Sequence, residues 1–262
     1  MKTQINGANI HYRREGAGFP IVMLHAGVAD SRMWQAQADE FAKQFDVVRP
    51  DMRGFGDSEL PARPWKPRED LLALMDELRL KPAHLVGCSM GGSLAIDFVI
   101  DHPERVSKLV LVGAGISGGK EDPRHEGLYA EVTAADERND MKAVNEAEMY
   151  LWLDGPYRPR GYVAQPLRDL FLDMNGKNLD ADWSTAPMQA LEPPAATRLS
   201  EITAPTLVIV GDKDLEPIRE TADLLASSIA GAHKVVIQDA AHLPNLEHPA
   251  EFNRIVLDFL LD

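Results

Sequence analysis

The chain has 262 residues, of which 45% are hydrophobic and 26% are charged, a composition typical of a globular enzyme rather than of a disordered chain. Its 27 Lys and Arg stand against 41 Asp and Glu, and the formal net charge of −14 disfavours nucleic acid or an anionic membrane as the main partner, because both would repel it. The only cysteine, Cys88, excludes an intramolecular disulfide and a cysteine-based zinc site.

Short apolar runs and helical runs alternate along most of the chain. The residues on either side of Asn6-Gly7 alternate in polarity and predict an antiparallel hairpin at a sheet edge. The elements predicted next are, in chain order, strand 20–24, helix 31–44 with Ser31 as its N-cap, strand 46–49, helix 67–80, strand 84–87, helix 90–100, strand 108–112, strand 206–210, helix 219–230, strand 234–237 and helix 249–261. The strands lack polar alternation, so we expect a sheet covered on both faces. The predicted fold class is α/β, with a doubly wound, mostly parallel sheet.

Residues 116–200 interrupt this alternation. They contain two predicted helices, at 138–153 and 166–174, and a loop around Glu192-Pro193-Pro194, but no strong β run. We interpret them as a helical cap, or lid, inserted into a core domain made of residues 1–115 and 201–262. The alternative is a set of ordinary packing helices without a lid role.

A serine lies at the junction of a predicted strand and a predicted helix. Residues 87–91 read G-C-S-M-G and match G-x-S-x-G in that context. Turning from strand to helix without a loop forces Ser89 into an uncommon backbone conformation, and Gly87 and Gly91 supply the small neighbours that such a turn needs. The helix N-terminus then points at any anion formed beside the hydroxyl. We predict Ser89 as a nucleophile and Cys88 as a bystander.

A serine hydroxyl needs a base to remove its proton, and His242 is the predicted base. It follows the last predicted strand, so it reaches the same sheet edge as Ser89. His248, the nearest rival, precedes the final helix, where a structural role is expected. His11 and His102 are interpreted as surface residues.

The acid that orients the base is expected after an intervening strand and before the histidine in sequence. Val210-Gly211-Asp212-Lys213-Asp214 supplies two candidates. We favour Asp214, because it lies further into the loop, and keep Asp212 as the alternative that braces the turn. Asp239 is close to His242 in sequence, but such adjacency rarely gives the side-on contact required.

Acyl transfer places negative charge on a carbonyl oxygen, so two backbone N–H groups are expected to bind it. Met90, which follows the nucleophile, is one predicted donor. The other is expected after the strand that ends at Leu24, where Gly27 is preferred and Ala26 is the alternative. His25 is expected to support this loop by hydrogen bonding.

Together these segments resemble the α/β-hydrolase fold superfamily, in its branch of single-chain esterases, enol-lactonases and cofactor-free haloperoxidases. The matching segments are His25-Ala26-Gly27 followed by Trp34, residues 51–58 (D-M-R-G-F-G-D-S), the turn at Ser89, residues 211–214 (G-D-K-D), and His242 followed by Glu247-His248-Pro249. The family usually has Gly where Ala26 stands. The resemblance implies a helical cap between the sixth and seventh strands, and structural, loop-bracing roles for Asp51 and Arg53.

Several relatives on this fold can be weighed. Haloalkane dehalogenases and epoxide hydrolases need Asp at the position of Ser89, which argues against both. Carbon–carbon bond hydrolases look similar around Ser89 but usually carry a Gly-Pro-Gly-like loop, which is absent after His25.

The expected activity is hydrolysis of a small-molecule carboxylic ester or lactone through an acyl-enzyme, without a cofactor or a metal. Two classes of alternative remain: a carbon–carbon bond hydrolase or cofactor-free lyase or oxygenase, and a non-catalytic small-molecule receptor. The aromatic and Met residues of the cap predict either a substrate pocket or the core of the cap itself: Met149, Tyr150, Trp152, Met174 and Trp183.

The location of the protein is predicted from two absences. The first residues lack the charged-then-apolar run of a signal peptide, and no window approaches the apolar length of a membrane span. We therefore expect a soluble, cytoplasmic protein; the sequence leaves its oligomeric state open.

Overall fold

A computed structural model describes residues 1–119 and 127–262 and contains one eight-stranded sheet. The strand order is β1-β2-β4-β3-β5-β6-β7-β8, with β1 and β2 antiparallel and the remaining strands parallel to one another. The strands are β1 Lys2–Ile5, β2 Ala8–Gly16, β3 Phe19–Leu24, β4 Phe45–Pro50, β5 Ala83–Cys88, β6 Val106–Val112, β7 Thr206–Gly211 and β8 His233–Ile237. This arrangement confirms the predicted fold class.

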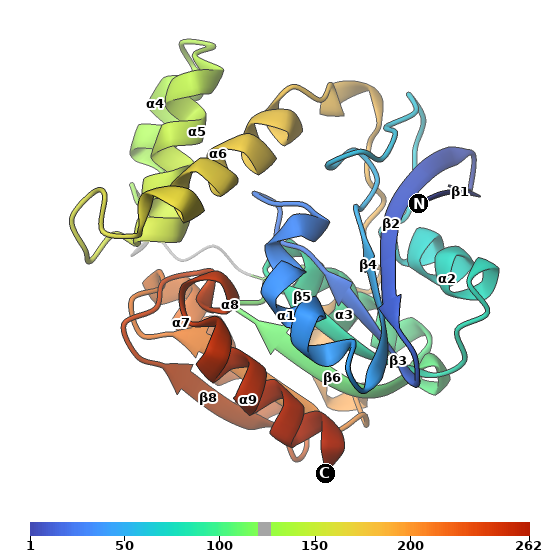
Figure 1. Cartoon of the computed structure of the whole chain (residues 1–262). Coiled ribbons are helices and arrows are strands. Elements are labelled where there is room, and N and C mark those ends of the chain that lie inside the picture. The colour runs from blue at the N-terminus through green and yellow to red at the C-terminus, as the bar shows by residue number, and fades with distance from the viewer. Residues whose placement is uncertain (120–126) are drawn as a thin grey trace.

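Helices cover both faces of the sheet (Figure 1). On one face lie α1 Gln35–Phe41 and α9 Pro249–Leu261; on the other lie α2 Pro67–Glu77, α3 Met90–Asp101 and α7 Glu216–Ser228. The central strands β4, β5 and β7 are buried along their whole length, as runs of Val, Ile and Leu without polar alternation require. The carboxyl ends of the parallel strands therefore meet at one edge, where loops can bring distant residues together.

The N-terminal hairpin is as predicted. Asn6 and Gly7 both have positive φ, 44° and 72°, which is the backbone pattern of the tight turn that joins twisted antiparallel strands. β1 pairs with β2 from Lys2–His11 to Ile5–Ala8, and β2 then pairs antiparallel with β4. The hairpin thereby forms the edge of the sheet.

The helix predicted at 31–44 is present in the structure, but the structure differs from the prediction at both of its ends. It begins as a 3₁₀ turn, η1 Ser31–Trp34, and continues as α1, which ends at Phe41. Asp30, rather than Ser31, is the N-cap, because its carboxylate accepts a hydrogen bond from the Arg32 N–H. The Ser31 N–H instead donates to Asp51.

The segment between β6 and β7 is helical, as predicted, but its helices have other bounds. They are α4 Ala130–Asp136, α5 Met141–Met149, the π-helical turn η4 Tyr150–Asp154 and α6 Gln165–Leu179. The helix predicted at 138–153 is present but begins later, because Asn139 turns left-handed (φ 54°) and the Asp140 side chain caps α5, which η4 continues to Asp154. Part of the proposed cap, residues 120–126, lies outside the described residues.

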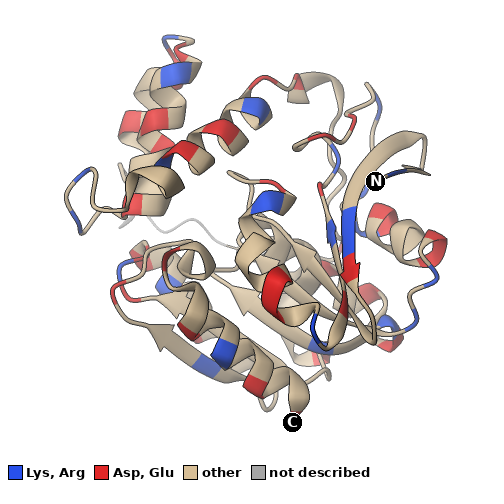
Figure 2. Ribbon diagram, in the orientation of Figure 1, with Lys and Arg blue, Asp and Glu red and all other residues tan. Residues whose placement is uncertain are grey.

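These helices lie beyond one end of the sheet, and α4, α5 and α6 carry many Asp and Glu side chains (Figures 1 and 2). A polypeptide helix long and apolar enough to span a membrane is absent from the described residues.

Candidate active site

Ser89 occupies the turn between β5 and α3 with φ 53° and ψ −113°, a strained conformation for a residue with a side chain. Its N–H donates to the Val112 carbonyl at 2.8 Å, and its carbonyl accepts from the Gly115 N–H at 3.2 Å. A Cβ on Gly87 would collide with the Gly91 carbonyl, and one on Gly91 would collide with the Leu24 carbonyl. The two glycines therefore allow α3 to begin in close contact with β3 and β5. The backbone of Ser89 is hydrogen-bonded to residues at the C-terminal end of β6 and just beyond it.

His242 and Asp214 form a buried pair. The imidazole Nδ1 lies 2.9 and 3.1 Å from the two carboxylate oxygens, and both side chains are almost fully buried. Asp214 Oδ1 also accepts from the Leu215 N–H at 2.8 Å. A carboxylate at Nδ1 fixes the tautomer with its proton there. The lone pair of Nε2 is thereby free to accept a proton.

His242 lies against residues that adjoin Ser89: Cys88, its neighbour in the chain, and Gly113, which follows the Val112 carbonyl that accepts the Ser89 N–H. The Cys88 Sγ lies 3.9 Å from the His242 carbonyl oxygen, and a Cβ on Gly113 would lie 3.1 Å from the imidazole. Nε2 is buried and has no hydrogen-bond partner among the described residues. The Ser89–His242 hydrogen bond is thus not formed in this state, as is common in unliganded sites, where such bonds shorten when substrate binds.

The loop after β3 carries the predicted oxyanion donors. The Ala26 N–H is buried and lies 3.3 Å from the Met33 Sδ, so it points into the core. Gly27 instead faces the turn between β5 and α3 that carries Ser89: a Cβ on Gly27 would lie 3.7 Å from the Met90 Cβ and Sδ. This geometry supports Gly27, rather than Ala26, as the partner of Met90.

His25 braces this loop, as predicted. Its Nε2 accepts from the Met52 N–H at 2.9 Å, and its Nδ1 donates to the Ala26 carbonyl at 2.8 Å. Both ring nitrogens are used, and burial lowers the pKa of the imidazole. A neutral, fully bonded ring is suited to support rather than to proton transfer.

The alternative site residues have other partners. Asp212 Oδ2 pairs with the Lys213 ammonium at 2.7 Å, and Oδ1 accepts from the Ala240 N–H at 3.4 Å. Asp239 accepts from the Tyr162 hydroxyl at 2.6 Å. The His248 Nε2 lies 2.8 Å from the Asp239 carbonyl, at the start of α9. Among these candidates, only Asp214 contacts the His242 ring.

The cap aromatics fall into two groups. Met149 and Met174 are buried in the hydrophobic core that includes α1 and α9, which supports the packing interpretation for them. The Trp152 ring lies 4.5 Å from the His242 ring, centroid to centroid, and Tyr129 lies 5.9 Å from Trp152. Trp183 packs on Phe55 at 4.9 Å. Trp152 therefore covers the imidazole, whereas Trp183, in the turn η5 Trp183–Thr185 of the inserted segment, packs on the core loop that follows β4.

A cavity of about 210 Å³ is lined in part by Met90, the residue that follows Ser89. Most of its wall is apolar, and its polar side chains lie around Asp97, which accepts from the Ser117 hydroxyl at 2.6 Å. The lining residues are Met52, Phe55, Trp65, Pro67, Arg68, Met90, Ser93, Leu94, Asp97, Ser117, Met188, Gln189 and Ala190. Arg68, the one cation among the described residues of this wall, bonds Asp101 at 2.7 Å and the Gln189 carbonyl at 3.4 Å.

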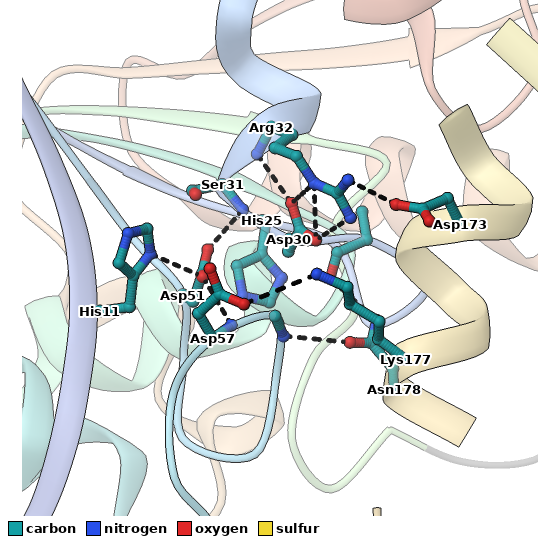
Figure 3. Close-up of polar contacts among 12 residues, drawn as sticks. His11, His25, Asp30, Ser31, Arg32, Asp51, Asp57, Asp173, Lys177 and Asn178 are labelled. Carbon is teal, nitrogen blue, oxygen red and sulfur yellow. Dashed lines mark hydrogen bonds and ion pairs between the residues drawn. The ribbon is translucent and has the colours of Figure 1, made fainter. Parts of the chain in front are cut away.

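Polar contacts fasten α6 to the core (Figure 3). Arg32 bonds Asp173 at 2.5 Å, and Lys177 lies 3.5 Å from Asp57. The Asn178 amide donates to the Ala29 carbonyl at 3.0 Å, two residues from Gly27. One end of the proposed cap is thus tied to the loop that carries Gly27.

The same region holds His11, Asp51 and Asp57 at a spacing suited to a metal ion. Asp51, however, already accepts from the Ser31 and Asp57 N–H groups and contacts the His11 ring at 2.8 Å. Arg53 bonds Asp70 through two nitrogens at 2.6 and 3.0 Å. We interpret the cluster as loop bracing, the role that the family resemblance implies for Asp51 and Arg53.

Sequence reasoning missed one buried ion pair beside His242, between Arg158 and Glu247 (2.6 Å). Glu247 stands in the Glu247-His248-Pro249 segment that contributes to the resemblance. Arg158 lies in a Pro- and Arg-rich turn with no periodicity, so the sequence carries no signal that it is buried.

Comparisons with known proteins agree with this architecture. A family described as alpha/beta hydrolase matches residues 21–255. The 2-hydroxymuconate semialdehyde hydrolase of Pseudomonas sp. strain CF600 is 34% identical, over 98% of this chain and 92% of that protein. The carboxylesterase YbfK of Bacillus subtilis is 28% identical, over 92% and 79%. The enol-lactonase structure from Burkholderia xenovorans LB400 has a TM-score of 0.80 at 28% identity, covering all of both chains. The chain therefore belongs to the alpha/beta hydrolase family, and it is a hydrolase.

Proposed function

We propose that this hydrolase cleaves a carboxylic ester or lactone through an acyl-enzyme on Ser89. The observation that carries the proposal is the buried His242–Asp214 pair at 2.9 Å, which lies against the chain neighbour of the strained Ser89 and has no hydrogen-bond partner on Nε2 among the described residues. Nucleophile, base and orienting acid follow three different strands in the order typical of this fold.

The proposed reaction has two halves. The Ser89 hydroxyl attacks the carbonyl carbon, His242 Nε2 takes its proton and then gives it to the leaving alkoxide, and an acyl-enzyme remains. Water next attacks the acyl group, its proton passes to Nε2, and Ser89 leaves with that proton. The Gly27 and Met90 N–H groups bind the oxyanion in both halves, and each is worth roughly 3 kcal/mol of barrier.

The cavity beside Met90 favours an uncharged, apolar acyl or ring group. Its described wall is mostly apolar and includes one carboxylate, Asp97, and Arg68 is already paired with Asp101. Burial also raises the pKa of Asp97, which is consistent with a wall that desolvates charged groups. Among the described residues that line it, a substrate carboxylate would find no unpaired cation.

Carbon–carbon bond hydrolysis is the second candidate. It is favoured by the 34% identity to a 2-hydroxymuconate semialdehyde hydrolase, a protein whose named substrate bears a carboxylate. The Gly-Pro-Gly-like loop expected of such enzymes is absent after His25, and the described residues of the cavity wall include no free cation. For these two reasons we propose the ester or lactone reaction ahead of carbon–carbon bond cleavage.

A substrate panel separates the candidates. The purified chain is assayed with p-nitrophenyl esters of increasing acyl length, with uncharged lactones and with a 2-hydroxy-6-oxo-dienoate. We expect turnover of the esters or lactones, with negligible cleavage of the dienoate. Cleavage of the dienoate alone would establish the second candidate. Binding without turnover of any compound would indicate a receptor.

A further inference from the structure

Residues 239–242, the loop that carries His242, are held by groups outside the sheet. The His242 N–H donates to the Trp152 carbonyl at 3.3 Å. The Ala241 N–H donates to Glu247 Oε1 at 2.8 Å, and the Asp239 carbonyl accepts from Arg158 Nη1 at 2.9 Å. Three successive anchors of the loop thus come from the inserted segment or from Glu247.

Arg158 joins these anchors into one network. Its side chain is only 4% exposed. Nη2 donates to Glu247 Oε2 at 2.6 Å and to the Leu153 carbonyl at 3.0 Å, while Nε donates to the Asp154 carbonyl. A single guanidinium therefore binds the end of η4, the Asp239 carbonyl and Glu247, which the planar, five-donor geometry of arginine permits and lysine cannot reproduce.

The turn after η4 fits closely against the same loop. Gly155 has φ 82°, and a Cβ there would lie 2.9 Å from the Ala241 Cβ and 3.0 Å from the Lys213 carbonyl. Lys213 immediately precedes Asp214, and its N–H donates to the Ala240 carbonyl at 2.9 Å. The inserted segment therefore contacts both loops that carry the His242–Asp214 pair.

We propose that Arg158 and Glu247 are positioning residues that fix the His242 loop against the inserted segment and so set the imidazole for proton transfer. The inference rests on the proposed role of His242 as the base. Both side chains act through the backbone of residues 239–241. A buried ion pair can often be replaced by apolar groups with little loss of stability, so its positioning effect can be measured apart from folding.

The test is the double variant Arg158→Met/Glu247→Leu, which removes both charges together and leaves neither unpaired. We expect the variant to remain folded with a lowered melting temperature, because the hydrogen bonds to backbone groups are lost with the ion pair, and we expect kcat to fall roughly 30- to 100-fold and KM to change by less than about threefold. Arg158→Lys keeps the charge but loses the multiple contacts, and we expect kcat to fall roughly tenfold. The lysine variant keeps the test decisive if the double variant fails to fold.

The control variant is Asp173→Asn, which weakens another contact between inserted segment and core, the Arg32–Asp173 pair, in which residues 239–242 take no part. Its kcat should equal that of the wild type. A folded Arg158→Met/Glu247→Leu or Arg158→Lys variant with wild-type kcat would overturn the proposal, as would an equal loss in Asp173→Asn.

A second readout does not depend on the substrate. The Nδ1 proton shared with Asp214 gives a low-field proton resonance, which we expect to be sharp in the wild type and in Asp173→Asn but broadened or lost in Arg158→Met/Glu247→Leu. An unchanged resonance in the double variant overturns the positioning role. If the wild type hydrolyses no ester or lactone while the resonance changes as expected, the positioning role stands and the proposed function fails.

Discussion

The indole of Trp152 lies 4.5 Å from the imidazole of His242, centroid to centroid, and the Trp152 carbonyl accepts the His242 N–H at 3.3 Å. Main chain and side chain of one residue in the π-helical turn η4 thus touch the candidate base. Such turns are often found at functional sites. Movement of the inserted segment would therefore alter both the solvent access and the orientation of His242.

Trp152 provides the first prediction. Trp152→Ala removes the ring that covers His242 while leaving the backbone carbonyl in place, so water gains access to the imidazole. We expect kcat to fall roughly tenfold, whereas Trp152→Phe should retain activity within about threefold because it keeps an aromatic cover. Steady-state kinetics on one ester measure both. Equal activity in the Ala and Phe variants would show that the ring has no part in catalysis.

The orienting acid can be tested with two neighbouring aspartates. Asp214→Asn should lower kcat by roughly 10³- to 10⁴-fold, because an amide at Nδ1 no longer favours the required tautomer or stabilises the imidazolium. Asp212→Asn is the matched control, since Asp212 pairs with Lys213 and does not contact the ring. We expect its kcat to stay within a factor of about three. A larger loss in Asp212→Asn would reverse the assignment.

The proposed oxyanion site can be tested by substitutions at Gly27 that remove or keep its single backbone N–H group. Gly27→Pro removes that donor, and we expect kcat to fall roughly 10²- to 10³-fold. Gly27→Ala keeps the donor, and its Cβ would meet only Met90 atoms at 3.7 Å. The alanine variant should therefore be almost as active as the wild type. Melting curves for both variants separate loss of the donor from a distorted loop; a fully active proline variant would exclude Gly27.

The raised pKa of the Glu247 carboxyl group predicts that the free energy of unfolding depends on pH. Burial raises its pKa to about 7, against an ordinary value of 4.5, although Arg158 opposes the rise. The native state thus binds this proton more tightly than the unfolded chain does. Its contribution to stability is full below about pH 4.5 and is lost as the pH rises through about 7.

The measurement is urea unfolding at several pH values between 5 and 8, roughly the range over which the group ionises. Relative to Glu247→Gln, the wild type should lose about 3 kcal/mol of unfolding free energy as the pH rises across this range. Parallel pH profiles for the two proteins would contradict the raised pKa.

The sequence predicted those parts of the fold and of the site that depend on residue patterns within a short stretch of the chain. The β5–Ser89–α3 turn needs glycines at fixed positions, and buried parallel strands need continuous apolar runs. Both features can therefore be recognised in the amino-acid sequence alone. The α4–α5 boundary depended on the left-handed Asn139, which the helical periodicity concealed. The contacts of Arg158 join segments that are 81 and 89 residues apart, and no local pattern specifies such pairings.

The most direct test of the central claim is labelling of the native protein with a fluorophosphonate, followed by mass spectrometry of the peptide that contains Ser89. Only an activated serine reacts with this probe. We predict one adduct, on Ser89, in the wild type, and none in folded Ser89→Ala; His242→Ala should react far more slowly. An unlabelled wild-type protein, or full esterase turnover by Ser89→Ala, would contradict the mechanism.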